Sequence, residues 1–228
     1  MKAVLISIQP KWCEKIANGE KTIEVRKSRP KLKTPFKVYI YCTKEKRKDD
    51  FITISGAFGL IRCPECAIYN RAKEYDCNGR VIGEFVCDRI SEYRAEFTDL
   101  HHFNAMHEDV CLNEIKKVGY YDEDDGDREY YYETSNAEEN PDDCDLLKGS
   151  CLTFNELRKY IGSTFYDKSF YGWHISDLKI YDKPKELSEF KHDTILHTRF
   201  NGYKEPLKKP PQSWCYVEEL QNEYKSKV

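Results

Sequence analysis

The sequence lacks any long run of apolar residues. A helix that crosses a bilayer needs roughly 20 such residues in succession, and no segment of the 228-residue chain approaches that length. The N-terminus, MKAVLISIQPKW, has an apolar run too short for a secretory signal and no small-residue cleavage site. We therefore expect a cytoplasmic protein with no membrane partner.

A regular cysteine pattern is also missing. The ten cysteines are scattered at irregular spacing, which favours reduced, buried thiols over the disulfide scaffold of a short secreted chain. Cys63 and Cys66 in RCPEC have the two-residue gap of a zinc knuckle, and with Cys77 and Cys87 they form a weak zinc candidate. Cys87 alternates inside an apolar strand, as a buried thiol does. We therefore expect no metal and no cofactor.

Charge is distributed very unevenly along the chain. The stretch from Tyr121 to Asp145 carries twelve acids and one base, so the rest of the chain has a net charge of +8. Residues 1–48 alone hold fourteen Lys and Arg against four Asp and Glu. Such a basic region suits a polyanionic partner, although a solvated surface explains it equally well. The acidic stretch is either an exposed solubilising loop or a mimic of nucleic acid that covers the basic face.

Strands dominate the predicted structure of the first half. KAVLISI predicts a strand, and QPKWCEKIANG predicts a short helix that begins near Pro10 and ends at Gly19. KTIEVRK alternates as a half-buried strand does, with Ile23 and Val25 on one face. The opposite face carries Thr22, Glu24 and Arg26. Further strands are expected at residues 36–44, 52–63 and 79–97, the last with a bulge at Gly83.

The second half reads as more varied. Residues 101–121 suggest helical or irregular structure, and the acidic, tyrosine-rich stretch after them suggests an exposed loop. In CLTFNELRKYIG, Thr153 and Glu156 form a capping box for a helix that Gly162 ends. A final strand is expected around WHISDLKIY, closed by Pro184. The lysine- and proline-rich tail is either a clamp on the domain or a loose arm.

These elements imply an α+β fold with a small curved or closed sheet. GEKTIEVRKSRP, preceded by ISIQPKWCEKIANG and followed by GWHISDLKIY, resembles the ASCH domain, a β-barrel family related to PUA RNA-binding domains. The family motif Gly-x-Lys-Thr-x-Glu-x-Arg is matched by Gly19, Lys21, Thr22, Glu24 and Arg26.

The resemblance is greatest to ASCH proteins of phages and of prophages in Gram-positive bacteria. It implies a PUA-like barrel with short flanking helices over residues 1–190. An acidic insertion interrupts this domain at about residues 95–150, and residues 191–228 form a C-terminal extension.

The motif suggests the wall of a pocket for RNA, single-stranded nucleic acid or a modified nucleoside. Lys21 and Arg26 can donate to phosphate or base acceptors, and Glu24 can accept from an exocyclic amino group. Trp12 and either Tyr171 or Trp173 can supply stacking faces. The alternative is an internal ion pair between Glu24 and Arg26 or Lys21. The predicted ligand-binding residues are Lys11, Trp12, Lys21, Thr22, Glu24, Arg26, Lys27, Arg29 and Trp173.

Two other classes of function stay open. ASCH relatives include acetylcytidine amidohydrolases with the motif Lys-Thr-x-Thr, but Glu24 here replaces the second threonine, which puts that chemistry in doubt. Ribonuclease activity is also attached to some ASCH proteins. In either hydrolase, Lys21 and Glu24 are the catalytic candidates. The third class is a protein-interaction module whose recognition element is the insertion or the tail.

Overall fold

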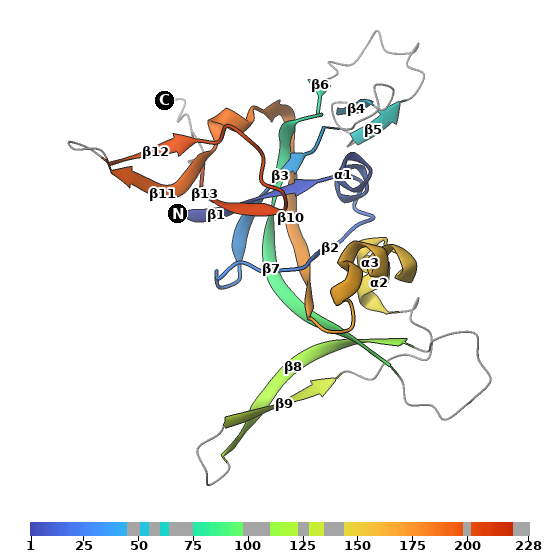
Figure 1. Cartoon of the computed structure of the whole chain (residues 1–228). Coiled ribbons are helices and arrows are strands. Elements are labelled where there is room, and N and C mark those ends of the chain that lie inside the picture. Colours follow the sequence, from blue (N-terminus) through green and yellow to red (C-terminus); the bar gives the residue numbers. More distant parts are fainter. Residues whose placement is uncertain are drawn as a thin grey trace. The chain divides into compact units, whose positions relative to one another are not determined.

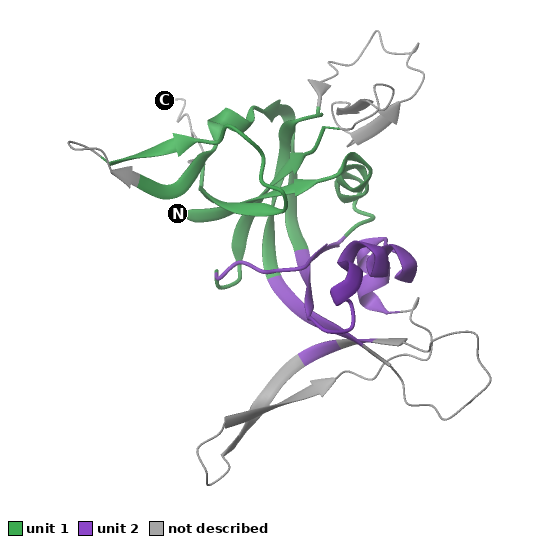
Figure 2. Ribbon diagram, in the orientation of Figure 1, with its two compact units in different colours: residues 1–21, 32–88, 175–228 green, residues 22–31, 89–174 purple. Residues whose placement is uncertain are grey.

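The computed structural model shows a mixed α+β fold in which strands dominate and helices are short (Figure 1). The residues that it describes are 1–44, 51–54, 60–63, 75–97, 110–122, 128–134, 144–197 and 202–220. The chain divides into two compact units (Figure 2). Unit 1 comprises residues 1–21, 32–88 and 175–228, and unit 2 comprises residues 22–31 and 89–174. The expected boundary at residue 190 therefore does not coincide with this division.

Unit 1 is organised around its first strand. β1 (Lys2–Ile8) pairs in parallel with β3 (Phe36–Cys42) and antiparallel with β13 (Trp214–Glu218). All residues of β1 except Lys2 are buried, which explains its largely apolar sequence, since a strand covered on both faces needs no polar alternation.

The other strands complete the sheets of this unit. In the described residues, the main sheet has the order β12-β11-β13-β1-β3-β7-β10 and ends with β2 (Ile23–Arg26), and a smaller sheet has the order β5-β4-β6. Their bounds are β4 (Phe51–Ile54), β5 (Leu60–Cys63), β6 (Tyr75–Asp76), β7 (Arg80–Phe97), β10 (Phe170–Lys185), β11 (Lys191–His197) and β12 (Gly202–Pro206). β7 and β10 contribute residues to both units.

The helix predicted after β1 is confirmed. α1 (Pro10–Ala17) begins with Pro10, where the missing N–H is no loss, and buries Cys13 and Ile16. Gly19 follows with φ of 76°, the left-handed conformation that glycine adopts without strain at a helix end.

The bulge predicted at Gly83 is confirmed as well. Ile40 faces Gly83 and Tyr41 faces Val81, so the register between β3 and β7 shifts by one residue here. A Cβ atom on Gly83 would lie 2.5 Å from the carbonyl oxygen of Lys179 in β10. The close approach of these two strands therefore requires glycine.

The C-terminal residues 202–220 are docked on unit 1. β13 pairs with β1 at five positions, and the backbone nitrogen of Ser7 donates to the carbonyl of Ser213 over 2.9 Å. The backbone nitrogen of Leu220 donates to the hydroxyl of Tyr39 over 2.9 Å. Of the two hypotheses for the tail, the clamp is correct for these residues.

Unit 2 combines strands with two short helices. Its elements, besides parts of β7 and β10, are β2 (Ile23–Arg26), β8 (Val110–Asp122), β9 (Arg128–Thr134), α2 (Asp145–Ser150) and α3 (Phe154–Ile161). The capping box of Thr153 and Glu156 is formed, and Gly162 ends α3 as predicted. The core lies between β2, β7, β8, β10 and the helices. Its buried residues are Ile23, Val25, Tyr93, Ala95, Leu112, Leu146, Leu147, Leu157, Ile161, Phe165 and Phe170.

Three predictions for these regions were wrong. Residues 110–122 form strand β8 instead of helical or irregular structure, and residues 128–134 of the acidic stretch form strand β9. These segments form strands because they pair in a sheet: β8 is hydrogen-bonded to β7 on one side and to β9 on the other. β10 also continues through Pro184 to Lys185.

No helix in the described part of the chain is long and apolar enough to cross a membrane.

Candidate functional site

The predicted site residues of unit 2 lie where β2 pairs with β10. In this antiparallel ladder Arg26 faces Tyr171, and Glu24 faces Trp173. Directly opposed residues project to the same side of a sheet, so these four side chains share one face. Ile23 and Val25 project to the other side and join the core of unit 2. The alternation predicted for β2 is therefore confirmed.

Glu24 and Arg26 form a buried ion pair. Arg26 Nη2 lies 3.0 Å from Glu24 Oε1, and both side chains are 8% exposed. The ion pair was the alternative interpretation of the motif, although we expected it on an exposed face, where it would contribute little. Burial changes its importance, because removing one partner of a buried pair leaves a charge without its counter-charge.

Tyr160 on α3 belongs to the same group. Burial raises the pKa of its hydroxyl, while the nearby Arg26 guanidinium partly offsets this increase through its charge and a hydrogen bond. The residue is 39% exposed, and Lys27 Nζ lies 5.6 Å from the ring centroid. Sequence reasoning missed Tyr160 because only tertiary packing brings α3 to β2. The available signal was its place next to the buried positions Leu157 and Ile161.

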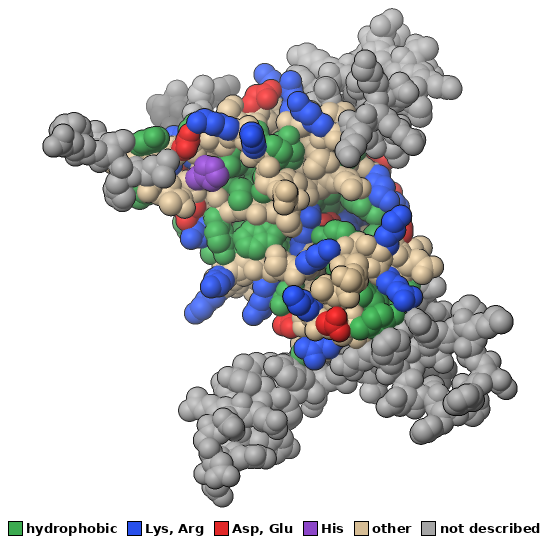
Figure 3. Space-filling view, in the orientation of Figure 1, with side chains coloured by type: hydrophobic (Ala, Val, Ile, Leu, Met, Phe, Trp, Pro, Cys, Tyr) green, Lys and Arg blue, Asp and Glu red, His purple; other side chains and the backbone are tan. Residues whose placement is uncertain are grey.

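A second pair of a cation and a tyrosine lies beside the first. Arg29 Cζ lies 5.7 Å from the ring centroid of Tyr171 in β10. Burial and the neighbouring Glu92 carboxylate raise the pKa of Tyr171, against the opposing charge of Arg29. Lys27 and Arg29 are themselves exposed. Lys and Arg side chains appear on the visible surface of both units (Figure 3).

The remaining predicted residues divide between the units. Lys11, Trp12 and Lys21 belong to unit 1, where Lys11 Nζ lies 4.1 Å and Lys21 Nζ 5.2 Å from the Trp12 ring. Lys21 is only 3% exposed. Thr22 belongs to unit 2 and is exposed, and its backbone nitrogen donates to the carbonyl of Gly149 over 2.8 Å.

Trp173 does not offer a stacking face. Its residue exposure is 0%, because the ladder position that places it beside Glu24 also places it in the interior. The expectation that it stacks on a ligand is therefore corrected, and Tyr171, which is half-buried, is the stacking candidate of β10.

His174 makes a polar chain that sequence reasoning did not find. Arg89 Nη2 lies 3.3 Å from His174 Nδ1, and His174 Nε2 lies 3.1 Å from Ser91 Oγ. A guanidinium only donates, so Nδ1 accepts and Nε2 carries the hydrogen that it donates to Ser91. This polarity is the reverse of that in a nucleophile and its base. His174 in this tautomer therefore does not activate Ser91.

Of the four cysteine candidates, the structure describes the side chains of Cys77 and Cys87. Cys77 and Cys87 are buried residues of unit 1. Cys66 lies outside the described residues, and so does the side chain of Cys63. Among the side chains that the structure describes, no cluster of His, Cys, Asp and Glu has the arrangement to hold a metal ion.

Comparisons of the chain with protein-family models, with curated proteins and with solved structures found no match. The resemblance to the ASCH family therefore remains a prediction from the motif.

Proposed function

We propose that the protein binds RNA or another ligand that contains a nucleobase. The observation that carries this proposal is the arrangement in unit 2. Lys27 and Arg29 follow β2 at alternate positions, and each lies over a tyrosine ring. Side chains of this kind hold unpaired bases by stacking and their phosphates by charge. The ASCH-type motif and a PUA-like barrel are parts of the same proposal.

The charges of the segment support a phosphate-bearing ligand. Lys27, Arg29 and Lys31 are exposed cations within five residues of chain, and the one carboxylate nearby on β2, Glu24, is ion-paired with Arg26. Binding of phosphates by such cations releases counterions from nucleic acid, which makes affinity depend steeply on salt. In unit 1, Lys11 and Trp12 supply a further cation beside an aromatic ring.

A hydrolase that uses the same residues is the alternative. Glu24 is its candidate base, and the ion pair directs Oε1 of this carboxylate toward Arg26 and leaves the group 8% exposed. A general base must reach the proton that it removes. The geometry therefore favours binding over proton transfer.

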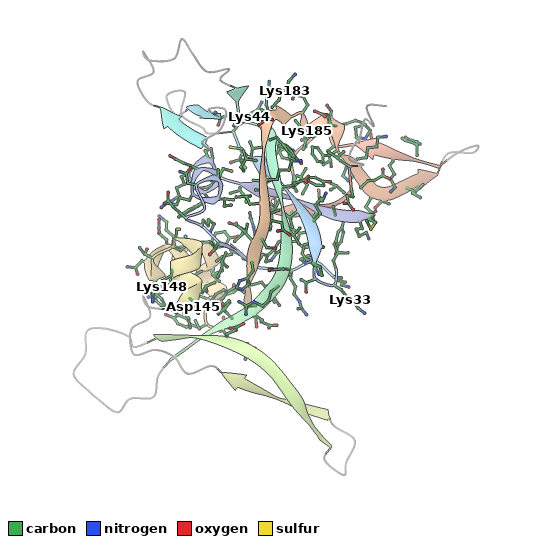
Figure 4. The ribbon with its side chains drawn as sticks, turned by 180° about the vertical axis from the view of Figure 1, so that it is seen from behind. Lys33, Lys44, Asp145, Lys148, Lys183 and Lys185 are labelled. Atoms are coloured by element: carbon green, nitrogen blue, oxygen red, sulfur yellow. The ribbon has the colours of Figure 1, made fainter. Side chains whose placement is uncertain are left out.

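The test compares the wild type with Lys27→Ala/Arg29→Ala and with a control of equal charge. The control is Lys44→Ala/Lys183→Ala, two exposed lysines of unit 1 labelled in Figure 4. Each protein is titrated with a short single-stranded RNA, the matching DNA and acetylated cytidine at several salt concentrations, and the products are analysed.

We expect salt-sensitive RNA binding by the wild type. Loss of two phosphate contacts should reduce the slope of log affinity against log salt by about 1.4, since each contact to a single strand contributes about 0.7. The control should retain the wild-type slope. Turnover of any probe would favour the hydrolase instead, and binding of none would refute the proposal.

A further inference from the structure

We infer that Tyr160 is the residue on which a base of the ligand stacks, and that Glu24 and Arg26 position it without touching the ligand. This inference rests on the proposed function and assigns roles within its site. It reverses the expectation from the motif, in which Glu24 and Arg26 read the ligand directly.

Accessibility separates the two roles. The side chains of Glu24 and Arg26 are each 8% exposed, too little for a base or a phosphate to make face-on contact with them. Tyr160 is 39% exposed. Among the described side chains of unit 2, it is the one large hydrophobic residue that is exposed. An exposed aromatic side chain beside basic residues is the arrangement on which unpaired bases stack while their phosphates meet the cations.

The orientation of Tyr160 explains how it contacts the buried ion pair at one end and Lys27 at the other. Its hydroxyl end lies toward Arg26 and Glu24, whose charges act on it in opposite directions. Its ring lies toward Lys27, 5.6 Å from the ammonium group. The polar end is therefore held inside while the ring remains available, as is common for tyrosine at interfaces.

The elements that support Tyr160, α3 and the ion pair of Glu24 and Arg26, are held in place by several contacts. α3 is fixed at its start by the capping box of Thr153 and Glu156 and along its length by the buried Leu157 and Ile161. The ion pair fixes the guanidinium that Tyr160 meets, because Glu24 and Arg26 project from alternate positions of one strand. A ring held in one orientation binds a base with less loss of conformational entropy.

Residues that contact phosphates and residues that position Tyr160 should differ in their effect on the salt slope, which is the slope of log affinity against log salt concentration. Lys27 and Arg29 meet phosphates, so removing either reduces the salt slope. Arg26 acts through Tyr160, so a change at Arg26 weakens binding without altering the salt slope, and it does so only while the Tyr160 hydroxyl is present.

The experiment uses the full chain and two probes, a labelled single-stranded oligoadenylate RNA and inorganic polyphosphate, which has charge but no base. The variants are Tyr160→Ala, Tyr160→Phe, Tyr160→Trp, Arg26→Lys and the double variant Arg26→Lys/Tyr160→Phe, with Lys27→Ala as the phosphate control. Tyr160→Phe and Tyr160→Trp keep an aromatic ring at this position, and near-ultraviolet circular dichroism checks the fold of every Tyr160 variant. The same measurement checks the fold of the variants at Arg26.

We expect Tyr160→Ala to weaken oligoadenylate binding at least about fivefold, the lower end for loss of one stacked base, with polyphosphate binding unchanged. Tyr160→Trp should keep the affinity, and oligoadenylate but not polyphosphate should quench its added fluorescence. Arg26→Lys should weaken binding in the wild type and leave Tyr160→Phe unaffected.

Several results would overturn the inference. They are wild-type affinity in Tyr160→Ala, an equal loss for both probes in that variant, or a salt slope reduced in Arg26→Lys as much as in Lys27→Ala. Failure of the wild type to bind oligoadenylate would also overturn the inference, whereas the proposed function fails only if the single-stranded RNA, the DNA and the acetylated cytidine of its own test do not bind either.

Discussion

Thr22 and Gly149 join the start of β2 to α2 through a backbone hydrogen bond of 2.8 Å. The approach is so close that a Cβ atom on Gly149 would lie 2.7 Å from Cδ1 of Ile23 and 3.1 Å from Oγ1 of Thr22. The motif strand is therefore positioned by a helix that lies more than 100 residues further along the chain.

Gly149→Ala should destabilise the protein because the new methyl group pushes α2 away from β2. Overpacking of this kind costs about 1–3 kcal/mol, which urea unfolding can measure. Ile23→Ala removes both atoms nearest to the new methyl group, Cδ1 at 2.7 Å and Cγ1 at 2.8 Å, so the double variant should be more stable than the sum of the single changes predicts. Lys148→Ala on the exposed side of the same helix is the control. Strict additivity of the two changes would contradict the packing argument.

Glu24→Ala should lower the free energy of unfolding by about 3–5 kcal/mol, because it leaves the charge of Arg26 buried without its carboxylate. Glu24→Leu combined with Arg26→Met should recover most of the loss. The matched control is Glu20→Ala, which breaks the exposed pair with Lys15 and should change stability by less than about 1 kcal/mol. Equal effects at Glu20 and Glu24 would show that burial of the pair has no energetic consequence.

Stability should fall in alkali through Tyr93. Burial, with a contribution from Glu114, raises the pKa of this tyrosine from 10.0 to about 12. The hydroxyl therefore ionises first in the unfolded state, so its stabilising effect is complete below pH 10 and disappears as the pH rises toward 12. Linkage puts the loss at about 2–3 kcal/mol.

Urea unfolding of the wild type and Tyr93→Phe, at about pH 9 and about pH 11.5, checks this prediction. The phenylalanine variant should lose less stability between the two pH values, although other buried tyrosines contribute to the decrease in both proteins. Parallel curves for the two proteins would argue against the raised pKa.

A chain that ends at Pro210 should lose the fold of unit 1. The truncation removes β13 and exposes the edge of β1, where five positions and the hydrogen bond to Ser7 were paired. Unpaired edges of buried strands promote aggregation, which size-exclusion chromatography detects. A synthetic peptide of residues 211–220 should prevent this aggregation, and the same peptide with Val217→Asp should not. A truncated chain that stays folded would show that the tail is dispensable.

Local chemistry was sufficient for several elements. Pro10 marks the start of α1 and Gly19 marks its end, and the capping box of Thr153 and Glu156 marks the start of α3. Each of these signals was readable because it acts through a hydrogen bond or a backbone angle within one turn. The alternation in β2 was also readable, since side chains of a strand change sides at every residue.

Pairing across long distances in the chain was not readable. Residues 110–122 become β8 through bonds to β7 and β9, and the tail becomes β13 through bonds to β1. Either segment has a composition compatible with other structures, so the partner decides the outcome.

For the candidate site, the order of residues along the chain was enough to assign residue types to each face of β2 and to identify the cations that follow it. How deeply each side chain lies depends on the packing of the folded chain. This packing buried the ion pair of Glu24 and Arg26, withdrew Trp173 into the core and brought Tyr160 from α3 to the surface beside them. The reason is physical: the periodicity of a strand is a local property of its backbone, whereas exposure depends on which distant segments pack over it.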